Sequence, residues 1–314
     1  MMDFLLVLLA SVFFCFQNVI VRVLFNEYTV AGVVQTGGFV TATLPNSFLL
    51  MAMRMLLVVP LMSALAPALH PTVWADLGGL CRPQQRRYLM RSLLGGASMY
   101  IYLALLYIAI GLIPTGIALT LFFVFPVFTA LLSWRFFGDV PTSFRWGMMG
   151  LALLGSGLTI PQNGLATSGL GVGLAIASGL AYGLYTVIAQ KSFDHIHPVT
   201  FTWISFAVTL ILSGISLLFW SAPETAIEWG PLWIGGLLSA IATSGGHLLY
   251  NSGIRQVGAT SASIIGSTNP ALTVVLAWLM IQETLSFVQL AGVALVTLSV
   301  ALLSQERRSS PRVK

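Results

Sequence analysis

Apolar stretches of roughly 20 residues recur along almost the whole chain. An α-helix needs about that length to cross the hydrocarbon core of a bilayer. Hydrophobic residues make up 57% of the 314 residues and charged residues only 7%, whereas an ordinary soluble domain carries about 25% charged residues. A soluble protein of this size could not cover its surface with so few charges. The sequence therefore predicts an integral membrane protein that crosses the bilayer many times.

Ten stretches have the length and composition of a membrane span. They predict an all-α membrane protein with ten transmembrane helices, over about residues 4–25, 47–66, 89–110, 113–134, 143–160, 169–189, 199–219, 231–254, 257–279 and 286–304. An even number of spans places both termini on the same side of the membrane.

The basic residues indicate which side that is. If both termini are cytoplasmic, all of the 14 Lys and Arg residues except Arg22 and Arg54 fall in cytoplasmic segments, and the last of these is a basic tail over 305–314. Cytoplasmic loops of membrane proteins carry such an excess of Lys and Arg. We therefore read the net charge of +5 as a sign of topology and not of nucleic-acid binding. The predicted location is the plasma (inner) membrane, with several passes and both termini in the cytoplasm.

One apolar segment occurs twice. FFVFPVFTALLSW spans 122–134 and GSTNPALTVVLAW spans 266–278, so that Pro126 and Pro270 are 144 residues apart. The repeat predicts two five-helix units, 1–160 and 161–304. Because five is odd, the second unit enters the membrane from the opposite side, which gives an inverted repeat. Transporters often use this arrangement, with one repeat moving against the other around a site near the bilayer midplane.

The two repeated prolines predict bends. A proline inside a helix leaves one carbonyl without its usual partner and kinks the helix. We assign Pro126 and Pro270 a helix-bending role, and we expect the freed carbonyls to face water or substrate. Prolines are also common in membrane helices without such a role, so a structural kink remains the alternative.

These doubled segments resemble the EamA-type transporters of the drug/metabolite transporter superfamily. The resemblance rests on PVFTALLSWRFFGD, NPALTVVLAWLMIQETLSFVQLAG and VGATSASII, and on LPNSFLLMAMR and ASGLAYGLYTV in the second and sixth spans. It implies a ten-helix inner-membrane carrier with an inverted repeat and a central cavity, of a family that often exports amino acids or other small metabolites. The outer loop over 26–46 is longer than the resemblance predicts, and its role stays open.

Five polar or aromatic residues are candidates for a substrate site: Asn18, Tyr182, Tyr185, His247 and Asn269. Polar groups are costly inside a membrane, so each is a functional candidate by default. The two tyrosines lie at helical spacing and could stack on a substrate and offer hydroxyl groups. His247 could couple proton movement to transport, or could be a neutral residue hydrogen-bonded between helices.

Arg54 is a candidate gate residue or a structural residue. It lies in the outer half of the second span, where it could bind a substrate carboxylate or an acid of an outer gate. Alternatively, it could extend to the interface or pair with Glu27. Phe122, Phe123 and Phe125 could contact a substrate, but we expect them to provide lipid-facing bulk. We expect Asp194, His195 and His197 to lie in a solvated loop.

The sequence contains no pattern for an enzyme or a nucleotide-driven pump. It has no phosphate-binding loop, no GxSxG or HExxH motif, and two cysteines, Cys15 and Cys81, without metal-binding spacing. We expect no cofactor, no metal, no nucleic acid and no enzymatic activity. The predicted function is a secondary transporter, favoured as a monomer in the lipid bilayer, that exports a small organic solute such as an amino acid by alternating access. An importer, and a non-transporting sensor or scaffold on a carrier fold, are the alternatives.

Overall fold

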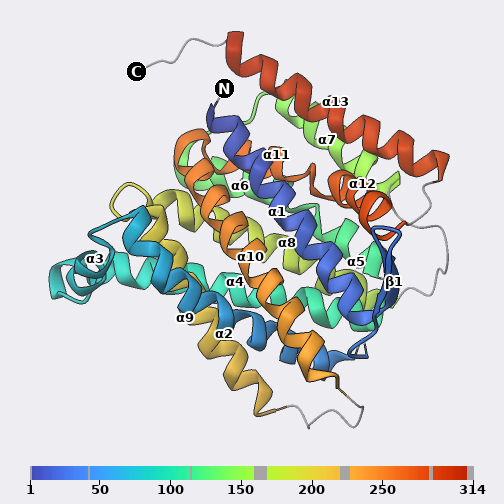
Figure 1. Cartoon of the computed structure of the whole chain (residues 1–314). Coiled ribbons are helices and arrows are strands. Elements are labelled where there is room, and N and C mark those ends of the chain that lie inside the picture. The colour runs from blue at the N-terminus through green and yellow to red at the C-terminus, as the bar shows by residue number, and fades with distance from the viewer. Residues whose placement is uncertain are drawn as a thin grey trace.

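The computed structural model describes residues 2–41, 43–113, 115–158, 168–219, 227–282 and 286–309. The predicted repeat boundary at residues 160 and 161 and the end of the basic tail, 310–314, lie outside these ranges. Helices form most of the described chain, and α1 begins at the same end of the molecule at which α13 ends (Figure 1).

The elements follow one another in a simple order along the chain. They are α1 (Met2–Phe25), β1 (Glu27–Val30), β2 (Val34–Gly37), α2 (Leu44–Leu69), α3 (Val73–Leu80), a 3₁₀ turn (Pro83–Gln85), α4 (Arg86–Leu112), α5 (Thr115–Phe122), α6 (Phe125–Phe137), α7 (Ser143–Leu158), α8 (Gly169–Ser192), α9 (Pro198–Leu217), α10 (Trp229–Val257), α11 (Ala259–Gly266), α12 (Asn269–Ile281) and α13 (Phe287–Ser309).

Eight segments of the described chain are long and apolar enough to cross a membrane, which makes this a multi-pass membrane protein. The two remaining predicted spans correspond to α7, which has 16 described residues, and to the apolar part of α13, Phe287–Leu302. A helix of 16 residues is about 24 Å long, less than the roughly 30 Å of the hydrocarbon core. These two helices pack against each other (Figure 1). The count of ten spans stays a prediction.

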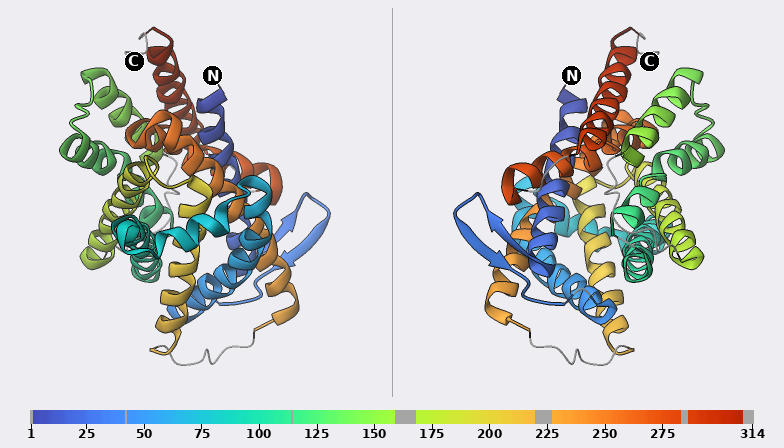
Figure 2. Two further views of the ribbon diagram at one scale, coloured as in Figure 1. Left: turned by 90° about the vertical axis from the view of Figure 1, so that its left-hand side faces the viewer. Right: turned by 90° about the vertical axis from the view of Figure 1, so that its right-hand side faces the viewer.

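A β-hairpin interrupts the all-α pattern that the sequence predicts. Strands β1 and β2 pair antiparallel, with Val30 opposite Val34. Ala31 and Gly32 both have positive φ, at 52° and 71°, which suits the tight turn of a hairpin. The hairpin lies at one edge of the bundle, where Ala31 N donates to Met280 O of α12 at 2.8 Å (Figure 2). Part of the long predicted outer loop is therefore ordered against α1 and α12.

The fourth and ninth predicted spans are each two helices and not one bent helix. α5 ends at Phe122 and α6 begins at Phe125, while α11 ends at Gly266 and α12 begins at Asn269. Each proline stands in the first turn of the second helix, where its missing N–H costs nothing. The proline therefore starts a new helix instead of kinking a continuous one.

The last three helices of the two halves follow one another at a constant offset. α11, α12 and α13 begin at residues 259, 269 and 287, and their counterparts α5, α6 and α7 begin 144 residues earlier, at 115, 125 and 143. Their packing also corresponds, because α1 lies against α10 and α12 as α8 lies against α4 and α6. The first helix of each half therefore packs mainly on helices of the other half.

Three side chains meet where α2, α3 and α9 end or begin. The rings of His70 and His197 stack with their centroids 4.0 Å apart, and His70 Nε2 lies 2.6 Å from Asp76 Oδ2. His197 caps α9 by accepting from Val199 N at 3.3 Å. Desolvation by burial lowers the pKa of His197 below its usual value, and the charges of His70 and Arg255 lower it further, while Asp76 acts in the opposite sense.

The lowered pKa of His197 predicts a loss of stability in acid. The unfolded chain binds the proton of this residue more readily, so the contribution is present above about pH 6.5 and is lost as pH falls below that value. We expect the Tm in detergent to fall less between pH 7 and pH 5 in His197→Asn, because asparagine also caps helices and does not titrate. An equal fall in both proteins would contradict this assignment.

Candidate functional site

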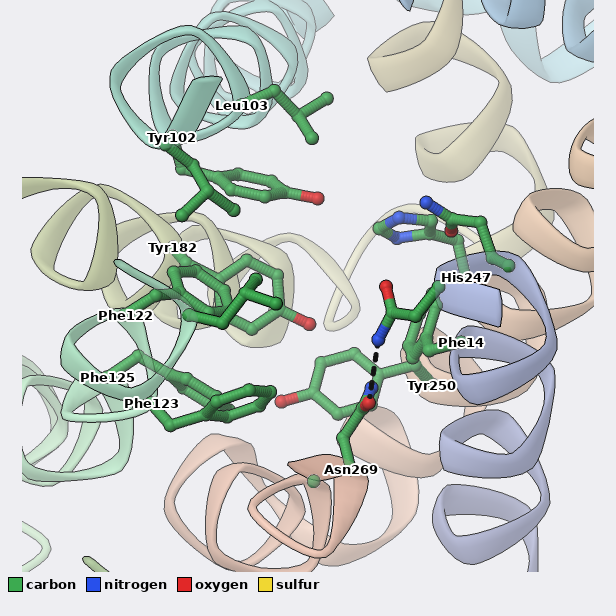
Figure 3. A pocket seen from close by; sticks show the side chains of 15 residues that line it. Phe14, Tyr102, Leu103, Phe122, Phe123, Phe125, Tyr182, His247, Tyr250 and Asn269 are labelled. Atoms are coloured by element: carbon green, nitrogen blue, oxygen red, sulfur yellow. Dashed lines mark hydrogen bonds between the residues drawn. The ribbon is translucent and has the colours of Figure 1, made fainter. Parts of the chain in front are cut away.

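A cavity lies between the two broken helices and the helices that pack on them. It is partly open, and the space inside it together with the solvent at its mouth amounts to about 650 Å³. Figure 3 shows the side chains around it. The lining residues are Phe14, Gln17 and Asn18 of α1, Tyr102, Leu103 and Leu106 of α4, Leu119, Phe122, Phe123 and Phe125 around the first helix break, Tyr182 of α8, His247 and Tyr250 of α10, and Gly266 and Asn269 at the second break.

Aromatic rings form one side of the cavity (Figure 3). The Tyr182 ring lies at its centre, 4.7 Å from the Phe125 ring and 4.8 Å from the Tyr102 ring, with T-shaped geometry in both pairs. Phe122 and Phe123 are also buried. The expectation that Phe122, Phe123 and Phe125 face lipid is therefore wrong, because α8 and α4 cover the helix break.

Amide groups form the opposite side. Asn18 Nδ2 donates to Asn269 Oδ1 at 3.1 Å and lies 3.2 Å from Thr273 Oγ1, which itself donates to the same oxygen of Asn269 at 3.0 Å. The Cys15 thiol approaches the backbone carbonyl of Asn269 at 3.4 Å. The side-chain oxygen of Asn269 thus accepts from one residue of α1 and one residue of α12. These contacts join α1 to the start of α12.

The two sides occupy equivalent places in the two halves. Phe125 is the first residue of α6 and Asn269 is the first residue of α12. Phe125 meets an aromatic ring, that of Tyr182, whereas Asn269 meets the amide of Asn18. Equivalent positions of the repeated segment therefore give the cavity an apolar aromatic side and a polar side.

His247 reaches the cavity from α10. Its ring lies 5.0 Å from that of Phe14 and 5.4 Å from that of Phe206, edge to face in both pairs. The Nδ1 atom is buried and has no hydrogen-bond partner within the described part of the chain. The expected hydrogen bond between helices is therefore absent from this atom. A buried nitrogen without a partner is unfavourable. A hydrogen bond from a solute or a water molecule in the adjacent space would therefore be favourable.

Tyr185 lies behind the cavity and does not line it. Asn251 Nδ2 donates to the Tyr185 hydroxyl at 2.8 Å and to Thr202 Oγ1 at 2.8 Å. The Tyr185 ring packs toward Phe201 of α9. Of the five residues that the sequence analysis selected, the structure brings Asn18, Tyr182, His247 and Asn269 together around one space and places Tyr185 in a supporting network.

A close helix contact covers the first break. Pro126 has no N–H to offer the carbonyl of Phe122, four residues earlier. A Cβ atom added to Gly179 of α8 would lie 2.7 Å from this carbonyl oxygen, and one added to Gly183 would lie 3.1 Å from Thr129 N. Glycine permits this approach of two backbones. The freed carbonyl therefore packs against α8, which differs from the expectation that it faces water or substrate.

Arg54 lies close to the cavity and not at an interface with water. It is 4% exposed, and its Nη2 donates to the Tyr107 hydroxyl at 3.4 Å. The ion pair with Glu27 that the sequence allows is not formed. Arg54 lines a second, smaller space with room for about one water molecule, which lies toward the hairpin end of α1 and α2.

The sequence analysis did not select several lining residues, Phe14, Gln17, Tyr102 and Tyr250 among them. Tyr250 and Tyr102 belong to the helices α10 and α4, and their rings lie on either side of the Tyr182 ring (Figure 3). Gln17 accepts from Thr243 Oγ1 at 3.2 Å, which joins α1 to α10. The position of Gln17 beside Asn18 was an available signal for Gln17. No group of three His, Cys, Asp or Glu side chains suited to a metal ion occurs in the part of the chain that the structure describes.

Comparison with known proteins identifies the family. Residues 169–305 match the profile of the EamA-like transporter family. A protein of Synechocystis sp., the transporter sll1319, is 53% identical over 98% of this chain and 95% of its own length. The chain belongs to the EamA-like transporter family. It is thus a membrane transporter, and the resemblance that the doubled proline segments carry is confirmed.

More distant relatives in the EamA-like family include proteins of other bacteria. The transporter YvbV of Bacillus subtilis is 27% identical over 71% of this chain and 72% of its own length. The threonine/homoserine exporter RhtA of Escherichia coli is 27% identical over 66% of this chain and 68% of its own. A crystal structure with 15% sequence identity superimposes with a TM-score of 0.74 over 98% of both chains, which supports the fold alone.

Proposed function

We propose that this EamA-like transporter exports a small amphipathic metabolite, of the amino acid class, through the central cavity by alternating access. The observation that carries the proposal is the cavity between the two helix breaks, with tyrosine and phenylalanine rings on one side and amide groups on the other. Aromatic faces bind apolar or cationic groups, and amides bind carboxyl or hydroxyl groups. A zwitterionic amino acid offers both kinds of group.

The absence of charged residues from the described cavity lining favours the same class of solute. No Asp, Glu, Lys or Arg is among the residues that line the central space. A solute with a high net charge would be poorly compensated there, whereas a zwitterion or a neutral molecule would not. The name of the Escherichia coli relative, a threonine/homoserine exporter, agrees with an amino acid.

Alternating access would use the two halves, 1–160 and 161–304, as inverted repeats. The offset of 144 residues between the last three helices of each half and the corresponding packing of α1 and α8 support this proposal. Movement would be concentrated at the breaks before Pro126 and Pro270, where two short helices meet without a continuous hydrogen-bond ladder. The distribution of Lys and Arg supports cytoplasmic termini.

Comparison of metabolites inside and outside cells tests the proposal. One strain would overproduce the native protein, and a second would overproduce the Tyr182→Ala, Asn18→Ala double variant at a matched membrane level. We expect at least one amino acid to accumulate in the medium with the native protein only. The same amino acid should then leave proteoliposomes that contain the native protein.

Two results would contradict export. Accumulation inside the cells with the native protein would indicate an importer. Equal metabolite profiles in both strains, together with no flux in proteoliposomes, would favour a sensor or scaffold on a carrier fold.

A further inference from the structure

A buried guanidinium without a counter-ion lies beside the central cavity. The Arg54 side chain is 4% exposed, and its one hydrogen bond in the described structure is to the neutral Tyr107 hydroxyl. The Nε atom is buried and has no partner, and no described Asp or Glu lies within ion-pair distance. Arginine keeps its charge in proteins, and a buried charge without a partner is strongly unfavourable. Binding of an anion beside Arg54 would therefore be favourable.

The space around Arg54 has the chemistry to bind such an anion, although in this conformation it has room for about one water molecule and would have to widen for a carboxylate. It is lined by the hairpin-side parts of α1, α2, α4 and α10, including Arg54, Tyr107 and Ser239. Ser239 Oγ is also buried without a hydrogen-bond partner among the described atoms. The remaining walls are largely apolar, with leucines of α1, α2 and α10. A guanidinium and a hydroxyl in an apolar pocket suit a planar carboxylate, which arginine binds through two parallel N–H groups.

This space also adjoins the central cavity. Gln17 lines the central cavity, and Val21, one helical turn further along α1, lines the Arg54 space. On α10, Ser239 lines the Arg54 space and lies about two helical turns from His247, which lines the central cavity. A solute that moves toward the hairpin end would pass from one space to the other.

We propose that Arg54 and Ser239 form a second binding position for the carboxylate of the transported solute, between the central cavity and the hairpin end. The inference rests on the proposed export of amino acids and adds a requirement for a carboxylate. In the empty protein the guanidinium is uncompensated, so a solute carboxylate gains a charge-assisted contact at this position. A solute of the same shape without the negative charge does not.

Paired solutes test the proposal. Proteoliposomes with the native protein, Arg54→Gln, Arg54→Lys or Arg135→Gln would be assayed with L-threonine and L-phenylalanine and with the carboxamide of each. Arg135 is exposed and so provides the matched control. We expect Arg54→Gln to lower the flux of the transported amino acid about tenfold, the size expected for a lost charged hydrogen bond. Carboxamide flux should change less than about twofold, and Arg135→Gln should behave like the native protein.

The outcomes separate this inference from the proposed function. Flux of amino acids and carboxamides at equal rates by the native protein would overturn the carboxylate position and leave the transporter assignment intact. So would equal losses of both fluxes in Arg54→Gln. No flux of any probe by the native protein, together with no amino acid exported in the metabolite comparison, would overturn both. A lower Tm of Arg54→Gln in detergent would indicate a structural arginine, whereas we expect an equal or higher Tm, because the substitution removes an uncompensated buried charge.

Discussion

Alanine at Gly179 should lower both the Tm and the transport rate of this EamA-like transporter, although it adds a single methyl group. The new Cβ would lie 2.7 Å from the backbone oxygen of Phe122, and no flexible side chain could move aside. α8 would have to shift away from the first helix break. Overpacking of this kind costs about 1–3 kcal/mol. Thermal unfolding in detergent and flux in proteoliposomes measure the two effects.

Gly173 provides the control on the same helix. A Cβ at this position meets nothing within 4 Å, so Gly173→Ala makes the same chemical change in open space. We expect its Tm to equal or exceed that of the native protein, because alanine favours helices over glycine. If the two alanine variants behaved alike, the tight contact of α8 with the Phe122 carbonyl would not be important for stability or for transport.

Removal of the Tyr182 ring should have the largest effect on transport among changes at the cavity. The ring lies against those of Tyr102, Phe125 and Tyr250, and its loss would take away the centre of the aromatic side. Each such contact contributes about 0.5–1.5 kcal/mol, and 1.4 kcal/mol corresponds to a tenfold change. We expect Tyr182→Ala to reduce flux in proteoliposomes by about tenfold or more per amount of protein.

Two further variants separate binding from folding. Trp134 is 48% exposed on α6, so Trp134→Ala removes a large ring outside the cavity and should leave flux unchanged. Tyr182→Phe keeps the ring and removes only the hydroxyl group, and should retain most of the stability of the native protein. Equal losses of flux in Tyr182→Ala and Trp134→Ala would count against a role of the cavity in transport.

The pair Tyr182 and Tyr185 illustrates the limit of reasoning from helical spacing. Residues three apart lie on neighbouring parts of one helix face, so the sequence predicted that both would reach the substrate. Tyr182 faces the first helix break, whereas the hydroxyl group of Tyr185 accepts a hydrogen bond from Asn251. The partner that a buried hydroxyl finds on another helix decided between them, and that partner is 66 residues further along the chain.

The same limit explains the phenylalanines at the first break. Helices of a membrane protein are apolar on all sides, because lipid and protein interior are both apolar. The pattern of hydrophobic residues therefore cannot distinguish a side chain that faces lipid from one that faces a cavity. Phe122, Phe123 and Phe125 were expected to face lipid and are buried around the site. Neither the sequence repeat nor the prolines contained this information.

What the sequence by itself determined is the class of the protein, its family and the places where two of its helices break. These features depend on the lengths of the apolar stretches and on two prolines at equivalent points, which can be recognised from the order of residues along the chain. Only the tertiary structure decided that Phe125 and Asn269 give the cavity one aromatic and one polar side, and that Arg54 lies buried beside it without a counter-ion. Those properties depend on contacts between helices distant in the sequence, because in an apolar environment the neighbours of each polar group decide whether its hydrogen bonds and charge are satisfied.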